Sequence, residues 1–344
     1  MSAPSHAQHG GHAQHGGHAA PAEAVASGES ARAVVFEAAG RLAFRDVALR
    51  VPAPDEATVA TTFSSISAGT ERLVFDGRLP GFPFLRFPLV PGYESVGVVQ
   101  AVGPEVRDVA VGDAVFVGGS HSYVDALGLF GGQSARLHKR ASQLVPLHGI
   151  DPQVAPLLAL AATSRHGVAR LGDVRGLRVG VLGMGGVGSF AAHFLALAGA
   201  RVVCCDRVAA RLAAGPAGAT LVDLSRTTLE ESVSDADAFV EATGDSTLIA
   251  ACARALRPGG RIALLSFYDH LSTPYVDLFT REVSLLVARE WQHDDLLAAR
   301  DAFASGAIDA RPLAAHVLPI ASYAEGYDTA FNDPRTPKVI FSWA

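Results

Sequence analysis

The chain contains only three cysteines in 344 residues, and two of them, Cys204 and Cys205, are adjacent. Neighbouring residues of a strand point to opposite faces, so this pair does not easily share one metal ion or one disulfide. Neither a Cys-x-x-Cys pair nor a cysteine–histidine cluster with zinc-ligand spacing occurs. The sequence therefore predicts no disulfide scaffold and no structural zinc, and this cysteine usage favours a reducing, cytoplasmic location.

Charged residues make up only 18% of the chain, and the formal net charge of −6 includes no basic run. The absence of a basic patch argues against a nucleic-acid partner and favours a small molecule. The N-terminus has neither a basic segment nor an apolar one after it, so we expect no signal peptide. The most apolar stretch, residues 179–205, is broken by glycines and carries His193 and Arg201. We therefore expect a buried strand–helix–strand unit there and no membrane span.

The first 31 residues differ in composition from the rest. Histidine recurs at every third position among glycine, alanine and glutamine, as His6, His9, His12, His15 and His18. Such a segment cannot bury a core, so we expect residues 1–31 to form a disordered tail. The tail is either a weak metal-binding segment or, as the composition favours, a flexible extension that binds metals only adventitiously.

Short alternating segments fill the chain from residue 32 to about residue 150. Runs such as AVVFEA, ATVATTFSSIS and ESVGVVQAVG carry β-branched residues at a period of two, and glycine-containing pairs separate them. A helical pattern then begins, with Asp151 as the predicted N-cap and Pro152 at the first helical position. A β-α-β rhythm continues to about residue 287, and residues 288–344 return to mixed elements.

A G-x-G-x-x-G run follows the first strand of the β-α-β region and opens an apolar helix. This context makes a weak pattern a strong prediction of dinucleotide binding. Gly183 permits a tight turn, Gly185 lets a pyrophosphate approach the backbone, and Gly188 allows the helix to lie close to the strand. Gly186 and Val187 begin the helix, whose N-terminus offers unpaired N–H groups to phosphates.

Asp206 ends the second strand of this unit, 23 positions after Gly183. A carboxylate there accepts hydrogen bonds from both ribose hydroxyls and repels a 2′-phosphate, so NAD is the predicted cofactor. Arg207 and Arg211 keep NADP open, because a nearby arginine can hold a 2′-phosphate.

Three runs of the chain resemble the medium-chain dehydrogenase/reductase superfamily: VPGYESVGVVQAVGPEV, VGVLGMGGVGSFAAHFLALAGARVVCCDR and EATGDSTLIAACARALRPGGRIALLSF. The resemblance covers nearly all of residues 32–344. It implies an α/β protein with a GroES-like β-barrel catalytic domain and a doubly wound Rossmann NAD-binding domain. The first would comprise residues 32–150 and 288–344, and the second residues 151–287.

The zinc-binding members of this superfamily carry three ligands that this chain lacks. By the resemblance, the ligand cysteine falls on Ala68 or Ser67, the ligand histidine on Tyr93, and the third ligand in the run LLALAAT. The four-cysteine structural zinc loop is absent as well. Because a catalytic zinc needs about three protein ligands, the sequence predicts no zinc.

A narrower resemblance rests on ISAGTERLVFDGRLPGFPFLRFPLVPGYESVG, ALGLFGGQSARL and LLALAATSRH. These runs are similar to the zinc-lacking bacteriochlorophyllide a dehydrogenases of bacteriochlorophyll synthesis. The resemblance implies oxidation of the 3-(1-hydroxyethyl) group of a bacteriochlorophyllide or chlorophyllide to 3-acetyl with NAD, and therefore a tetrapyrrole as substrate. A homodimer is a candidate assembly. The alternatives are a zinc-independent NADPH quinone or enone reductase and a non-catalytic dinucleotide-binding sensor or scaffold.

The candidate catalytic residues follow from the same alignment and from isolated titratable side chains. Tyr93 either hydrogen-bonds the substrate oxygen and relays its proton, or only fills the volume of the lost metal site. Thr70 could join a hydroxyl relay, although the histidine that ends it in zinc relatives falls on Leu73. Glu94 is expected to anchor the site rather than act as a base. Further candidates, each also open to a purely structural role, are His121, Tyr123 and His166.

Aromatic and basic residues crowd one segment after Thr70. It contains Phe75, Phe82, Phe84 and Phe87, together with Arg78 and Arg86. Such a mixture could stack on a flat macrocycle while an arginine meets its propionate. A hydrophobic loop packed on the barrel, or a subunit interface, explains the same composition.

Overall fold

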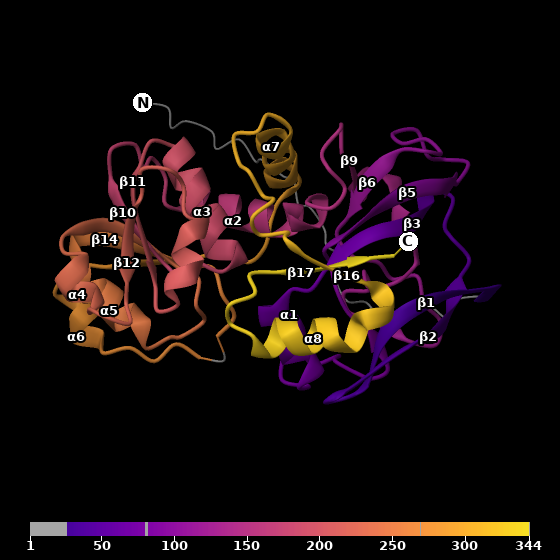
Figure 1. Cartoon of the computed structure of the whole chain (residues 1–344), viewed down its shortest axis with the longest axis horizontal. Helices are drawn as coiled ribbons and strands as arrows, with labels where there is room; N and C mark the ends of the chain where they lie inside the picture. The colour runs from indigo at the N-terminus through magenta and orange to yellow at the C-terminus, as the bar shows by residue number, and fades with distance from the viewer. Residues whose placement is uncertain (1–25, 80–81, 269, 344) are drawn as a thin grey trace, which may run out of the picture.

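The computed structural model describes residues 26–79, 82–268 and 270–343, and it forms two lobes (Figure 1). The histidine-rich residues 1–25 lie outside the described residues. The strand β1 begins at Ala26 and pairs there with Arg50. The prediction that a disordered tail extends to residue 31 is therefore wrong for residues 26–31, because ladder hydrogen bonds order them.

The β-rich lobe, on the right in Figure 1, contains two sheets. One has the strand order β2-β1-β4-β7, and the other has the order β16-β17-β3-β5-β6-β9, with β8 paired to β3. The strands are β1 (Ala26–Ala38), β2 (Arg41–Arg50), β3 (Glu56–Ser65), β4 (Leu89–Val90), β5 (Ser95–Val102), β6 (Ala114–Val117), β7 (Leu127–Gly128), β8 (Arg136–Arg140), β9 (Leu144–Pro146), β16 (His316–Pro319) and β17 (Val339–Ser342). Alternation along β3 buries Ala57 and Val59 in a valine-rich cluster, as a period of two requires.

The second lobe is built on a six-stranded parallel sheet with the order β12-β11-β10-β13-β14-β15. Its strands are β10 (Arg178–Leu182), β11 (Arg201–Asp206), β12 (Thr220–Asp223), β13 (Ala236–Glu241), β14 (Leu256–Leu264) and β15 (Ser284–Val287), and its helices are α3 (Gly186–Leu197), α4 (Leu229–Ser232), α5 (Leu248–Ala255) and α6 (Tyr275–Phe279). This order confirms the predicted doubly wound sheet. Successive strands are added outward from β10 to β12 on one side and from β13 to β15 on the other, so the strand order switches between β10 and β13. The crevice at the carboxyl ends of those two strands is where such sheets bind ligands.

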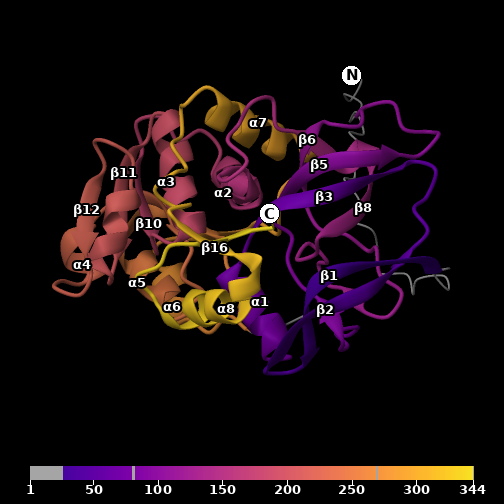
Figure 2. The ribbon, with the colours of Figure 1, turned by 45° about the vertical axis from the view of Figure 1, so that its right-hand side comes forward.

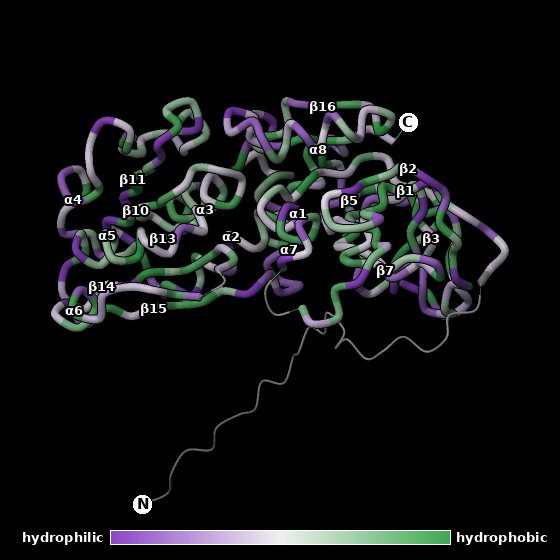
Figure 3. The backbone as a smooth tube through the Cα atoms, turned by 90° about the horizontal axis from the view of Figure 1, so that it is seen from below, coloured by the Kyte–Doolittle hydropathy of each residue, from purple (hydrophilic) through white to green (hydrophobic). Residues whose placement is uncertain are grey.

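The central strands of the six-stranded sheet, β10, β11 and β13, are buried on both faces. Cys204 lies in the core cluster that includes residues of α2 and α3, whereas Cys205 lies in the cluster that includes residues of α5. The expectation that these neighbours face apart is thus confirmed. The hydropathy of the residues follows the same layering, with apolar residues concentrated in the strands and in the helices packed against them (Figure 3). In the part of the chain that the structure describes, no helix is long and apolar enough to cross a membrane.

Four helices lie between and beside the sheets: α1 (Ala68–Phe75), α2 (Leu158–Arg170), α7 (His293–Ala304) and α8 (Tyr323–Asn332). Figures 1 and 2 both place α8 beside α1 near the junction of the lobes. The chain ends in β17, which pairs antiparallel with β3 and thereby returns the C-terminal segment to the β-rich lobe. Short 3₁₀ turns span Ala141–Gln143, Ala155–Leu157, Ala209–Ala214 and Ile320–Ser322.

The helix predicted from Asp151 begins later, at Leu158. The Asp151 carboxylate accepts the N–H of Gln153 at 2.9 Å and so caps a local turn instead of a helix. Such a turn is the usual competitor of an N-cap for an aspartate.

Candidate active site

A cavity of about 2240 Å³ is lined by residues of both lobes. Its walls come from α1, the segment 82–88, the N-terminal end of α3, the connections after β13 and β14, and the residues before β17. Ligand pockets for drug-sized molecules usually measure about 300–1,000 Å³. The cavity therefore has room for two sizeable molecules side by side.

The glycine run after β10 has the backbone that the sequence predicts. Gly183 has a φ of +86°, which side-chain-bearing residues rarely adopt, and a Cβ on Gly188 would lie 1.8 Å from the carbonyl oxygen of Gly183. A Cβ on Gly185 would meet no atom within 4 Å. The open space over Gly185 is what an approaching ligand needs, whereas Gly183 and Gly188 are required by the fold of the loop.

The N-terminus of α3 faces this cavity, since Gly185, Gly186 and Val187 all line it. The N-cap residue Gly185 has no side chain that could accept a hydrogen bond from the first turn. The first amides of a helix lack intrahelical partners, and the helix dipole makes this end positive. The arrangement fits a phosphate group.

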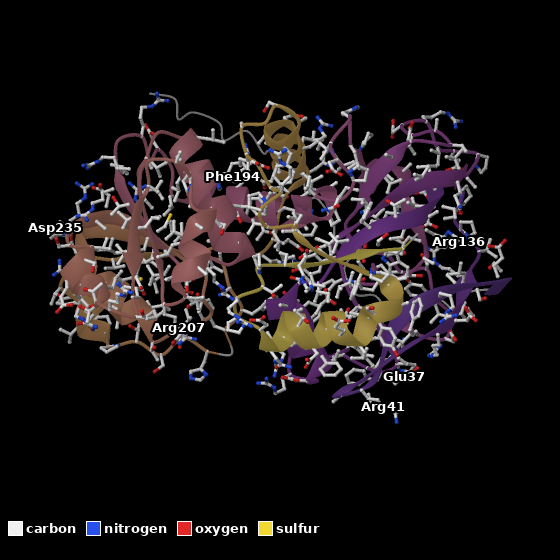
Figure 4. The ribbon with its side chains drawn as sticks, viewed as in Figure 1. Glu37, Arg41, Arg136, Phe194, Arg207 and Asp235 are labelled. Atoms are coloured by element: carbon white, nitrogen blue, oxygen red, sulfur yellow. The ribbon has the colours of Figure 1, made fainter. Side chains whose placement is uncertain are left out.

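Asp206 lies directly behind this loop. Its carboxylate accepts the N–H of Met184 at 2.7 Å and the N–H of Val208 at 2.8 Å, and the residue is only 5% exposed. Asp206 thus stiffens the loop, but it does not line the cavity, so its contact with a ribose hydroxyl stays a prediction. Arg207 is exposed on the lower edge of this lobe in Figure 4, and Arg211 lines the cavity while donating to the carbonyl of Pro334.

Three hydroxyl groups meet in the β-rich wall of the cavity. The Tyr93 hydroxyl lies 2.5 Å from Ser67 Oγ and 3.3 Å from Thr70 Oγ1, and all three residues line the cavity. The ring of Tyr93 packs edge-on against Phe130, with centroids 5.1 Å apart, and against Trp291. Ser67 precedes α1 and Thr70 lies in its first turn, so the helix fixes both partners. We call Tyr93, Ser67 and Thr70 the hydroxyl cluster.

The hydroxyl of Tyr93 stays protonated at neutral pH. Burial raises the pKa of Tyr93 well above its ordinary value, and the nearby carboxylates of Glu94 and Glu71 raise this pKa further. The protonated phenol can therefore donate a hydrogen bond into the cavity, and the hydroxyls of Ser67 and Thr70 are within reach to exchange a proton with it.

Glu94 and Lys338 form a buried ion pair beneath the hydroxyl cluster. The Glu94 carboxylate accepts hydrogen bonds from Ser65 Oγ and Lys338 Nζ through one oxygen, and its other oxygen, Oε1, has no partner in the described part of the chain. Lys338 also donates to the carbonyl of Ile66 at 2.6 Å. Its side chain is 5% exposed, lines the cavity and lies near Gly186, where an added Cβ would be 3.8 Å from Lys338 Cδ. Sequence reasoning missed Lys338, although its place just before the last strand could have suggested it.

The remaining catalytic candidates, His121, His166 and Tyr123, differ in their positions and contacts. His121 is exposed and lines the cavity. His166 lies on α2, where its Nδ1 is 3.0 Å from Asp295 of α7, and it does not line the cavity. Tyr123 lines the cavity, but its hydroxyl donates to the Gly131 carbonyl at 2.7 Å. The contacts of His166 and Tyr123 fit structural roles, and His121 stays a candidate because it lines the cavity.

The residues at the place of a catalytic zinc do not fit that metal. Ser67 and Thr70 flank the tyrosine there, and Leu160 of α2 faces the same cavity. In residues 26–79, 82–268 and 270–343, no three side chains of His, Cys, Asp or Glu are grouped to hold a metal ion. Zinc prefers thiolate, imidazole and carboxylate ligands, so we derive no step through zinc.

Glu71 is a second residue that sequence reasoning missed. It is fully buried on α1, accepting the N–H of Ser67 at 2.8 Å and the hydroxyl of Tyr327 of α8 at 2.6 Å. Burial raises the pKa of Glu71 to about 7, although these two hydrogen bonds act in the opposite direction. The glutamate thus connects the cap of α1 to α8 behind the hydroxyl cluster.

We expect Glu71→Gln to change the pH dependence of stability. A carboxyl whose pKa is higher in the folded chain stabilises the fold while protonated, and this contribution is lost as the pH rises from about 4.5 to about 7. The free energy of unfolding of the natural protein should therefore fall by about 3 kcal/mol relative to Glu71→Gln across that window. Urea unfolding of both proteins at pH 5 and pH 8 measures this difference, and parallel pH profiles would refute it.

The comparisons with known proteins agree with this geometry. Residues 53–149 match the model of the alcohol dehydrogenase GroES-like domain. The chain is 35% identical over 317 residues to 2-desacetyl-2-hydroxyethyl bacteriochlorophyllide A dehydrogenase of Cereibacter sphaeroides. The aligned region covers 90% of this chain and 98% of that protein. The chain belongs to the medium-chain dehydrogenase/reductase superfamily. The equivalent protein of Rhodobacter capsulatus is 37% identical over 297 residues, or 85% of this chain and 91% of that one.

Solved structures of the superfamily share the fold at lower identity. A Sinorhizobium meliloti protein bound to NADP superimposes with a TM-score of 0.79 at 22% identity, over 91% of this chain and 99% of that one. An Escherichia coli alcohol dehydrogenase complexed with NADH has a TM-score of 0.79 at 20% identity, over 92% of this chain and all of that one. The predicted combination of a GroES-like domain with a Rossmann domain is thus confirmed.

Proposed function

We propose that this protein oxidises the 3-(1-hydroxyethyl) group of a (bacterio)chlorophyllide to a 3-acetyl group, using NAD and no catalytic zinc. The observation that carries the proposal is the hydroxyl cluster, which lines a cavity large enough for a dinucleotide and a macrocycle and in which, by the resemblance, Tyr93 and Ser67 stand where zinc relatives have metal ligands. The names of the two bacterial relatives support the same substrate class.

The glycine loop and α3 would hold the dinucleotide. Gly185 leaves room for the pyrophosphate, and the first amides of α3 meet its oxygens. Lys338 uses two of its three N–H groups on Glu94 and Ile66, so one remains for a phosphate or ribose oxygen. When bound, the dinucleotide supplies the acceptor for the hydride of the carbinol carbon.

The hydroxyl cluster would orient the carbinol and receive its proton. As the hydride leaves the carbinol carbon, the carbinol O–H would pass its proton to the Tyr93 oxygen while the Tyr93 O–H passes its own proton to Ser67 or Thr70, whose displaced hydroxyl proton would leave to solvent in the cavity. Beneath this cluster lie the two opposite charges of the Glu94 carboxylate and the Lys338 ammonium, and the Oε1 atom of Glu94 has no partner among the described residues. We also propose that residues 32–150 and 288–344 form the catalytic domain, which β1 extends back to Ala26, and that residues 151–287 form the NAD-binding domain.

We also propose a cellular location and an oligomeric state for the protein. All three cysteines are buried and free, which fits a reducing compartment such as the cytoplasm. β15 is an edge strand of the six-stranded sheet, and an unpaired edge can be covered by a second copy of the chain, so we propose a homodimer.

The test is to incubate the protein with NAD and 3-(1-hydroxyethyl)bacteriochlorophyllide and to follow the long-wavelength absorption band together with NADH. We expect a band shift accompanied by NADH formation. Turnover of small quinones or enones with NADPH, and not of the pigment, would instead support a reductase. Tight NADH binding without turnover of any alcohol would support a sensor or scaffold.

We expect Asp206→Asn to weaken the preference for NAD. Loss of the carboxylate charge removes the repulsion of a 2′-phosphate, and the ratio of kcat/KM for NAD to that for NADP should fall about 10-fold. The amide cannot accept both loop N–H groups, so a loss of about 1 kcal/mol in stability should accompany it. Steady-state kinetics with both cofactors measure the ratio. An unchanged ratio would remove Asp206 from the specificity argument.

A further inference from the structure

The segment of residues 82–88, which we call the aromatic loop, borders the cavity along its length. Its cavity-lining residues are Phe82, Phe84, Leu85, Arg86, Phe87 and Pro88. Two other members of the aromatic and basic segment that follows Thr70, Phe75 and Arg78, do not line the cavity. Phe75 packs in the core against Phe36, with centroids 5.0 Å apart, and Arg78 pairs with Asp76 at 2.6 Å. The structure thus distinguishes side chains that the sequence leaves equivalent.

The aromatic loop lies close to the hydroxyl cluster. Phe130 is the link, because its ring centroid is 5.1 Å from that of Tyr93 and 6.0 Å from that of Phe82. Phe82 therefore lies no more than about 11 Å from Tyr93. This separation is comparable with the breadth of a chlorin ring, so one macrocycle can reach from the hydroxyl cluster to the loop. Phe84, at the rim, is 66% exposed and presents apolar surface to such a ligand.

Arg86 has no partner among the residues that the structure describes. The other arginines that line the cavity are engaged: Arg50 with Glu56, Arg140 with Asp55, Arg211 with the Pro334 carbonyl and Arg289 with Glu290. Within the described ranges, Arg86 makes neither a hydrogen bond nor an ion pair. Its guanidinium therefore keeps its full set of donors, whose planar arrangement matches a carboxylate.

Lys139 is another cation of the cavity wall without a partner among the described residues. It lies far from the hydroxyl cluster, because it pairs across the sheet with Ala57, eight residues along β3 from Ser65. At about 3.3 Å per strand residue this is on the order of 25 Å. A macrocycle positioned at Tyr93 does not span that distance, and Arg86 is the better placed cation.

We infer that Arg86 binds the free propionate carboxylate of the pigment and makes the protein prefer a chlorophyllide acid to its ester. Phe82, Phe84 and Phe87 pack on the macrocycle on either side of this contact. The inference rests on the proposed function, and it assigns the residue that selects the anionic form of that substrate.

The test compares the free acid of 3-(1-hydroxyethyl)bacteriochlorophyllide a with its methyl ester. We expect a KM for the ester about 10-fold above that for the acid. Arg86→Gln should raise the KM for the acid about 10-fold, leave the KM for the ester unchanged and keep kcat within about twofold. Arg86→Lys should retain part of the preference. Arg78→Gln, which removes a nearby exposed arginine that pairs with Asp76 and lies outside the aromatic loop, should leave the KM for both substrates unchanged.

Each outcome separates the two proposals. Equal KM values of the natural protein for acid and ester, or an equal effect of Arg86→Gln on both, would overturn the assignment of Arg86 and leave the proposed function standing. A failure of the natural protein to turn over either pigment would overturn both. Unfolding midpoints equal to that of Arg78→Gln establish that the Arg86 variants are folded.

Discussion

Gly188→Ala should abolish dinucleotide-dependent activity and destabilise the protein by about 3 kcal/mol. The added methyl carbon would lie 1.8 Å from the Gly183 carbonyl oxygen, and neither β10 nor α3 can move away without disturbing the core between them. The loop must therefore open, which displaces the amides that would meet the pyrophosphate. Urea unfolding and titration with NADH measure the two effects.

Gly185→Ala is the matched control on the same loop. Its backbone, with φ of −73°, suits alanine, and the new methyl group meets no protein atom within 4 Å. We expect the free energy of unfolding to change by less than about 0.5 kcal/mol while NADH affinity falls at least about 10-fold. Equal NADH affinity of Gly185→Ala and the natural protein would show that no ligand approaches the loop at this point.

Tyr93→Phe should lower kcat about 100-fold and leave NAD binding unchanged. The change removes the hydroxyl that contacts Ser67 and Thr70 but keeps the ring against Phe130 and Trp291, so packing is preserved. A positioned proton donor or relay typically contributes about 100- to 10,000-fold. Pigment turnover at saturating substrate measures the loss.

Tyr123→Phe is the control for this substitution, because Tyr123 lines the same cavity and its hydroxyl is bound to the Gly131 carbonyl. We expect its kcat to stay within about threefold of the natural protein, with a stability loss of about 1 kcal/mol from the unpaired carbonyl. If Tyr93→Phe turned over pigment as fast as Tyr123→Phe, Tyr93 would be a packing residue and the proton path would lie elsewhere.

The nucleotide half of the fold could be predicted from local sequence. The strand, glycine run, helix and following strand lie next to one another in the chain, and the spacing of the glycines predicts the role that the structure gives to Gly183 and Gly188. The residue at which a helix begins could not be predicted equally well. Nothing local distinguishes Asp151 as a helix cap from Asp151 as a turn former, and the structure has the turn.

The catalytic half could be predicted only in part, because contacts between distant residues decide it. His121 and His166 carry the same local signal, yet a partner 129 residues away places His166 between α2 and α7. Lys338 reaches Glu94 only because β17 pairs with β3, across 244 residues of sequence. The resemblance to zinc dehydrogenases pointed to Tyr93, Thr70 and, as one of two alternatives, Ser67. Glu71 and Lys338 emerged as their surroundings only in three dimensions.

The most direct test of the account is pigment oxidation by protein freed of metal. The protein is treated with a chelator until zinc falls below about 0.1 per chain, so that the histidine-rich N-terminal residues carry none into the assay. It is then mixed with NAD and 3-(1-hydroxyethyl)bacteriochlorophyllide. The account predicts undiminished turnover, with one NADH formed for each 3-acetyl product. Turnover that disappears with the metal and returns in proportion to added zinc would contradict it.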